Sequence, residues 1–260
     1  MNKSRNIPDG SGSLNRATII MTTIARGLNK GSLLTEIISR TGLPRTTVVR
    51  TLTMLGELGW VVKDEQSGRF NLGMDLAAMG YSAISRNPIE RVAATQLSQL
   101  ADELNQVVYL SVRSGLDMVC IGRYEGEAVI QVGRGGPGLR GPLGMTQSCF
   151  GIFSALPVKE VNEIIEANMK RYHKVEGFDE IGFRQSITET CGRGYGSFSN
   201  VILDRAMSGL GVPIRDLSGY PVAGIGTTFI SDWLSEQQQR DHVKLMRAAA
   251  IRIERNLFKP

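Results

Sequence analysis

The sequence predicts an α+β fold in two parts: an N-terminal winged helix-turn-helix, and a second domain with a mainly antiparallel sheet flanked by helices. In the first third of the chain, apolar residues recur at helical spacing and are followed by two short apolar runs around a polar turn. Further along, short β-type runs lie between helical segments. The net charge of +5 is confined to residues 1–86, where 11 basic residues outnumber 6 acidic ones. A basic module joined to a neutral one favours a polyanionic partner at one end only.

Three helices are expected before the two short runs, over residues 14–25, 33–40 and 45–58. Ser32 is a candidate cap for the second helix, and Thr41-Gly42-Leu43-Pro44 predicts a tight turn after it. The third helix ends before Gly59. It carries one apolar stripe at three- and four-residue spacing, formed by Val48, Leu52, Leu55 and Leu58.

A hairpin is expected next, because residues 60–63 and 69–72 favour strands and flank a polar turn. Trp60 is expected to be buried under this hairpin. A connecting helix over residues 74–86 is interrupted by Asn87-Pro88, since proline disfavours helix in the residue before it. We therefore divide the chain into a flexible tail (1–12), a winged helix-turn-helix domain (13–73), a linker helix (74–88) and a second domain (89–260).

The second domain is expected to open with a helix over residues 89–104. A glycine-rich segment covers residues 133–144. Strands are predicted at residues 107–112, 118–122, 128–132, 196–201, 209–214 and 222–229, and helices at 148–156, 158–168, 180–192 and 235–257.

The third helix has a polar face opposite its apolar stripe, formed by Arg45, Thr46, Thr47, Arg50 and Thr51. Arginine can bind guanine through two hydrogen bonds, and threonine can contact phosphate or a thymine methyl group. Lys63 and Arg69 stand at the ends of the hairpin, where a wing reaches backbone phosphates. An ordinary amphipathic helix with a solvated basic face would show the same residues. The order of helix, glycine turn, basic helix and hairpin favours binding to double-stranded operator DNA.

Several segments resemble the IclR family of transcription regulators. The most specific are residues 35–52, with the Gly42-Leu43-Pro44 turn and Arg50, and residues 55–61. The similarity continues at residues 97–105, at Pro142-Leu143 with Thr146, and at residues 211–216 with Gly219. It thus covers nearly all of the chain beyond the first dozen residues.

The resemblance implies a sequence-specific DNA-binding transcription regulator with a GAF-like effector-binding domain, which forms a homodimer or homotetramer. Its effector would be a small molecule, often an organic acid or an aromatic metabolite. The family's pocket positions correspond here to Met145, Thr146, Gln147, Ser148, Asn200, Gly226 and Thr228. These neutral groups suit a small polar ligand, although they can instead satisfy backbone groups or cap the helix at Ser148. Arg134 and Arg140 are either partners for a ligand carboxylate or solvated loop residues.

Five positions depart from the family's pattern and leave the shape and polarity of the pocket open. The family commonly has histidine where this chain has Gly144, glycine where it has Cys149, and a basic residue where it has Phe150. It commonly has an acidic residue where this chain has Asn200 and cysteine where it has Gly209.

An enzyme is the alternative from another class. Residues 133–138 match G-x-G-x-x-G after a predicted strand, and Glu160 follows at a spacing suited to a ribose contact. However, Pro137 and Pro142 prevent the helix that a dinucleotide loop must open into, and neither His173 nor His242 lies in a catalytic motif. We therefore expect no catalysis. A small-molecule-binding module without DNA-binding function is a further alternative, against which the basic face argues.

The three cysteines, Cys120, Cys149 and Cys191, lack the spacing of metal ligands. We expect reduced structural thiols, no metal and no cofactor.

No apolar run approaches the roughly 18 residues of a spanning helix, and the polar N-terminus is unlike a signal peptide. The expected location is the cytoplasm, with no membrane partner. The sequence specifies neither the effector, nor the operator, nor repression or activation, nor dimer or tetramer.

Overall fold

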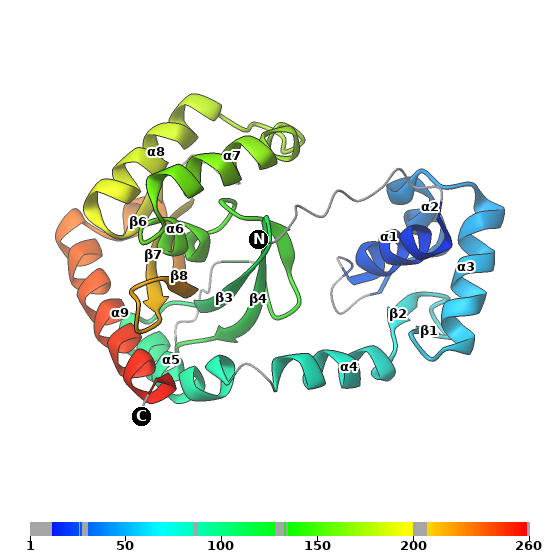
Figure 1. The fold of residues 1–260 in the computed structure, drawn as a ribbon. Coiled ribbons are helices and arrows are strands. Elements are labelled where there is room, and N and C mark those ends of the chain that lie inside the picture. Colours follow the sequence, from blue (N-terminus) through cyan, green and yellow to red (C-terminus); the bar gives the residue numbers. More distant parts are fainter. Residues whose placement is uncertain are drawn as a thin grey trace. The chain divides into compact units, whose positions relative to one another are not determined.

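The computed structural model describes residues 12–25, 27, 31–85, 88–127, 133, 135–199 and 207–258. The chain divides into two compact units, residues 1–87 and residues 88–260. The first unit holds the elements from α1 to α4, and the second holds those from α5 to α9 (Figure 1).

The first unit contains helices and one hairpin: α1 (Ser13–Ala25), α2 (Leu34–Thr41), α3 (Arg45–Glu57), β1 (Val61–Lys63), β2 (Phe70–Leu72) and α4 (Met74–Ile84). Between α2 and α3, Gly42 has a φ of 66°, a left-handed conformation that costs glycine little. The strands of the hairpin are antiparallel, with Val61 opposite Leu72. The predicted helix-turn-helix and hairpin are therefore confirmed.

The core of the first unit joins α1, α2, α3 and β1 through Ile20, Ile24, Ile37, Val48, Leu52, Leu55 and Val61. Burying one such side chain contributes about 1.5–3 kcal/mol, so this cluster holds α3 in place. The predicted apolar stripe of α3 is confirmed for its first three members. Leu58 is 54% exposed because the helix ends at Glu57.

Two predictions for this unit are wrong. Leu33, and not Ser32, is the N-cap residue of α2, and its N–H donates to the Glu36 carboxylate at 2.8 Å. Ser32 is buried, and its backbone pairs with that of Phe70 in an isolated β-bridge beside the hairpin. Trp60 is only partly buried, because it lies at the edge of the core.

The second unit is built on a six-stranded sheet with the order β5-β4-β3-β8-β7-β6, in which neighbouring strands are antiparallel. This confirms the predicted sheet type, but the glycine-rich segment contains a strand, β5, that was not predicted. The strand expected at residues 128–132 lies outside the described residues. The strands are β3 (Val108–Ser114), β4 (Asp117–Tyr124), β5 (Arg140–Pro142), β6 (Gly196–Ser199), β7 (Met207–Arg215) and β8 (Pro221–Ile230).

Helices cover both faces of this sheet: α5 (Ile89–Leu104), α6 (Gln147–Phe153), α7 (Val158–Tyr172), α8 (Glu180–Arg193) and α9 (Glu236–Leu257), with the short turn η2 (Ser231–Trp233) before α9. One core cluster packs α5 and α9 on one face, through Leu97, Ile225 and Met246 among others. A second cluster packs α6, α7 and α8 on the opposite face. These are the two helical layers on either side of the strands in Figure 1.

Glycines on β7 and β8 allow α6 to lie directly on the sheet. A Cβ atom added to Gly211 would lie 2.0 Å from the carbonyl oxygen of Gln147, and one added to Gly224 would lie 2.1 Å from that of Ser148. Cβ atoms do not approach backbone oxygen this closely, so a side chain at either position would displace α6. Thr146 is the N-cap residue of α6, and Ser148 lies buried in its first turn.

Candidate nucleic-acid interface and ligand pocket

The exposed side of α3 carries three of the predicted DNA-binding residues. Arg45, Thr46 and Arg50 are exposed, while Val48 and Leu52 anchor the opposite side of the helix in the core. Neither arginine forms an ion pair with another described residue. Their guanidinium groups are therefore available to an anionic or hydrogen-bonding partner.

Two predicted residues are less accessible, and two exposed ones were missed. Thr47 and Thr51 are partly buried, and the Thr51 hydroxyl donates to the Thr47 carbonyl at 2.8 Å. On the other flank, Val49 is 41% exposed and Thr53 is exposed. Val49 follows Arg45 by four residues, and Thr53 follows Val49 by four, a spacing that predicts one shared face of the helix. The aliphatic side chain of Val49 does not fit the polar pattern expected of that face.

The hairpin places its two predicted basic residues differently. Lys63 is exposed on β1. Arg69 is partly buried and holds the base of the hairpin against α2, because its Nη1 lies 3.4 Å from Glu36 Oε2 and donates to the Gly31 carbonyl at 3.2 Å. At the turn, the backbone N–H of Ser67 is the main cause that lowers the pKa of Asp64.

A groove of about 410 Å³ separates α3 from the hairpin. Leu34, Val49, Leu52, Thr53, Gly56, Val61, Lys63, Gly68 and Phe70 line it. Its walls are mainly apolar, and Lys63 is the one charged residue in this lining.

The structure brings together four of the predicted effector-binding residues, at the contact of α6 with the sheet. The Nε2 atom of Gln147 donates a hydrogen bond to Thr228 Oγ1. An added Cβ at Gly226 would lie 2.6 Å from Ser148 N, so β8 and α6 touch at this point. Met145 and Thr146 immediately precede these residues of α6, whereas Asn200 lies outside the described residues.

The side chain of Gln147 occupies the space that a larger residue would need at Gly209. A Cβ atom at Gly209 would lie 2.2 Å from Gln147 Cγ. The family commonly has cysteine at this position. In this chain the side chain of Gln147 occupies the space beside Gly209. The glutamine side chain therefore packs against β7 at Gly209.

On the side of the sheet that α6 covers, three buried hydroxyl groups have no hydrogen-bond partner of normal geometry among the described residues: that of Ser148, that of Ser111 beside the Cys120 thiol, and that of Tyr109 beside Gly133. On β3, Tyr109 lies opposite Gly226 of β8, and Ser111 lies opposite Gly224. Both glycines contact Ser148 of α6, so the three hydroxyls share one face of the sheet. Buried polar groups normally have partners, which makes the face of the sheet beneath α6 a candidate ligand site. Tyr109 and Ser111 were missed, although their alternation along β3 predicts a shared face.

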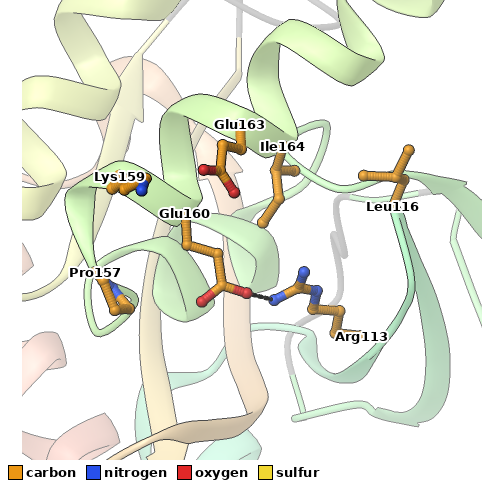
Figure 2. Close-up of a pocket in the computed structure, with 7 residues that line it drawn as sticks. All are labelled: Arg113, Leu116, Pro157, Lys159, Glu160, Glu163 and Ile164. Carbon is orange, nitrogen blue, oxygen red and sulfur yellow. Dashed lines mark hydrogen bonds and ion pairs between the residues drawn. The ribbon is translucent and has the colours of Figure 1, made fainter. Parts of the chain in front are cut away.

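A second hollow, of about 420 Å³, lies between the β3–β4 hairpin and the start of α7 (Figure 2). Arg113 of β3 forms an ion pair with Glu160 of α7, and the Tyr220 hydroxyl donates to the same carboxylate at 3.0 Å. Partial burial opposes ionisation of Glu160, but hydrogen bonds from Arg113 and Tyr220 outweigh it and lower its pKa. These polar groups have partners already, and Glu160 is committed to Arg113 rather than free for a ribose.

The predicted loop arginine Arg140 instead lies on β5. Its Nε donates to Asp117 at 2.7 Å, and Arg171 of α7 contacts the other oxygen of the same carboxylate at 2.6 Å. Arg140 therefore lies on a strand and pairs with Asp117, while its side chain remains 48% exposed to solvent. Arg134, its suggested companion, lies outside the described residues.

Cys120, Cys149 and Cys191 are free thiols. Burial raises the pKa of Cys120 to about 11 and also raises the pKa of Cys149. Across the described part of the chain, no group of three histidine, cysteine or acidic residues is placed to hold a metal ion. His242 is half-buried, and this burial lowers its pKa. Within the same residues, no helix is long and apolar enough to cross a membrane.

Two family models match the chain. Residues 13–65 match the IclR helix-turn-helix domain, and residues 81–255 match the bacterial transcriptional regulator IclR C-terminal model. Among relatives, the HTH-type transcriptional regulator KipR of Bacillus subtilis is 27% identical over 236 residues, which are 88% of this chain and 92% of that protein.

Solved structures show the same fold. A transcriptional regulator from Alicyclobacillus acidocaldarius superimposes with a TM-score of 0.73 at 20% identity, covering 93% of this chain and 97% of the other. An IclR homologue from Microbacterium hydrocarbonoxydans, complexed with 4-hydroxybenzoate, gives a TM-score of 0.70 at 18% identity and covers 95% and 99%.

Proposed function

This chain belongs to the IclR family of transcriptional regulators, and we propose that it binds operator DNA through the exposed face of α3 and binds its effector where α6 meets the sheet. Family membership makes it a DNA-binding regulator controlled by a small molecule. The assignment of particular residues to these two tasks is the proposal.

The observation that carries the DNA-binding assignment is the pair of free arginines on α3. Arg45 and Arg50 are exposed without ion-pair partners among the described residues, on a helix whose other side is fixed in the core. Such a helix fits the major groove, where arginine binds guanine O6 and N7. Thr46 joins them as a base or phosphate contact, and Lys63 binds a backbone phosphate from the hairpin.

The effector is proposed to be a small organic acid or aromatic metabolite. The unpartnered hydroxyls of Tyr109, Ser111 and Ser148 can donate to a carboxylate or accept from a phenol. The bond between Gln147 and Thr228 uses one amide N–H and one lone pair of the hydroxyl, so the Gln147 carbonyl oxygen and the Thr228 O–H remain for an effector. One solved relative is complexed with 4-hydroxybenzoate, a ligand with both a carboxylate and a phenol group. This supports the proposed chemical class.

A homodimer is proposed as the smallest functional assembly. No side chain of α4 is buried within the described residues, although the helix is rich in apolar groups: Met74, Met79, Tyr81 and Ile84 are exposed. A second copy would cover such a helix. Twofold symmetry would then place two recognition helices on two half-sites of a palindromic operator.

The decisive experiment is fluorescence anisotropy of the full chain with DNA from beside its own gene, against scrambled DNA, over a series of salt concentrations. Tighter binding to the native fragment, weakening steeply with salt because phosphate contacts release counterions, is the expected result. An effector then has to change operator affinity, and by linkage operator DNA must change effector affinity by the same factor. Absence of binding to either DNA at low salt would contradict the proposal.

A further inference from the structure

An apolar stripe lies beside the arginines on the exposed side of α3. Val49 is 41% exposed, Thr53 is exposed, and Gly56 continues the stripe three residues later. Residues three and four apart are neighbours on a helix surface. An exposed valine between Arg45 and Arg50 contributes nothing to the core of the unit, so its position needs another explanation.

Thr53 adds a methyl group to this stripe. Its hydroxyl donates to the carbonyl oxygen of Val49 at 3.1 Å and is therefore held against the helix backbone. Because the hydroxyl and the methyl group occupy different staggered positions about Cα–Cβ, the Cγ2 methyl remains as the free end of the side chain. Val49 and Thr53 thus present adjacent methyl groups.

The stripe forms one wall of the groove between α3 and the hairpin. Lys63, on the facing wall, is the one charged residue of that lining. With α3 in the major groove and Lys63 on a phosphate, the groove between them would face the DNA. The groove is continuous with the face of α3 that carries Arg45 and Arg50. This continuity favours DNA as the occupant of the groove, since a protein partner would have to bind a surface flanked by two arginines.

We infer that Val49 and Thr53 read thymine through its 5-methyl group. This methyl group projects into the major groove on the side of the base that is near its own backbone, and apolar contact with it distinguishes thymine from cytosine. The arginines would read guanine, and the stripe would read A·T pairs beside them. This inference rests on the proposed DNA-binding face of α3.

The test replaces thymine by uracil, which lacks only the methyl group. Duplexes of about 30 base pairs, or three helical turns, are selected by the full chain from a random pool, and each thymine of the best duplex is changed in turn to deoxyuridine. Wild-type protein is expected to lose about fourfold in affinity at one or more positions of each half-site, the value for one buried methyl group. Val49→Ala and Thr53→Ser are expected to bind the thymine duplex more weakly and to lose the preference at those positions.

Two matched variants control for the loss of methyl groups. Thr18→Ser removes a methyl group from an exposed threonine of α1, whose hydroxyl makes the same bond to the carbonyl four residues earlier, at 2.9 Å. Val158→Ala truncates an exposed valine on α7. Both are expected to keep the full wild-type preference for thymine.

The outcomes separate the two proposals. If selected duplexes bind tightly but uracil is accepted at every position, or if Val49→Ala and Thr53→Ser keep the wild-type preference, the inference is overturned and DNA binding stands. If the pool yields no enriched duplex, the proposed DNA-binding function fails, and the inference fails with it.

Discussion

The side chain of Gln147, at the start of α6, donates a hydrogen bond through Nε2 to Oγ1 of Thr228 on β8. The bond joins two residues that the sequence assigned to the effector, and it lies over Gly209, where an added side chain would strike the glutamine. The bond therefore ties the start of α6 to β8.

Thr228→Val tests the strength of that bond, because valine keeps the shape of threonine and removes the acceptor. An amide left without its partner at a partly buried site costs about 1 kcal/mol, near the lower end of the range for unsatisfied groups. Urea denaturation should show a fall of that size in the free energy of unfolding, with an unchanged m-value. Thr188→Val is the control, since that exposed hydroxyl bonds only the Arg184 carbonyl, and its change should stay within about 0.5 kcal/mol. Equal effects of the two variants would contradict the contact.

Gly211→Ala tests whether α6 rests directly on β7. The new Cβ would lie 2.0 Å from the carbonyl oxygen of Gln147, and such overpacking should lower the free energy of unfolding by about 3 kcal/mol or more. Gly192→Ala on α8 is the matched control, because its Cβ would meet open space. It should stabilise the protein by about 0.5–1 kcal/mol, as expected within a helix. If both variants unfold like wild type, the seating of α6 described above is wrong.

Local patterns were sufficient to predict most helices and strands. The stripe of Val48, Leu52 and Leu55 fixes one side of α3 by spacing alone, and therefore also exposes Arg45 and Arg50. This is why the helix-turn-helix and most of the exposed basic face of α3 could be predicted. Contacts within one turn of helix follow directly from the order of residues.

The parts that could not be predicted depend on partners distant in sequence. Arg69 is drawn to Glu36, 33 positions away, and the glutamine–threonine bond spans 81 positions. A glycine such as Gly211 weakens a strand pattern when read by itself, and its purpose is visible only once α6 is seen against it. The strand β5, three residues in a glycine-rich segment, is defined by its pairing with β4 and not by its composition.

Arg50 and Lys63 should differ in how they contribute to DNA binding. Arg50→Ala should cost ~1–3 kcal/mol of operator affinity and relax the preference for one base pair, whereas Lys63→Ala should weaken all duplexes alike and reduce the salt slope by about 1. Anisotropy titrations with operator and scrambled DNA at several salt concentrations measure both quantities. Arg184→Ala, in an ion-pair network on α8, is the control and should change neither. If Arg50→Ala weakened the binding of all duplexes equally, Arg50 would be assigned to a contact with the DNA backbone and not with a base.

His242 should make the stability of the protein depend on pH near neutrality. Burial lowers the pKa of His242 in the folded chain, and the neighbouring Asp241 opposes this only in part. In the unfolded chain the imidazole takes up its proton below about pH 6.5, so the unfolded state binds more protons there and the free energy of unfolding falls as pH decreases. The carboxyl groups with lowered pKa values, such as Asp64 and Glu160, titrate at lower pH. Urea midpoints between neutral and mildly acidic pH should fall for wild type and stay closer to constant for His242→Gln. A fall of the same size in both would show that the buried imidazole is not the cause.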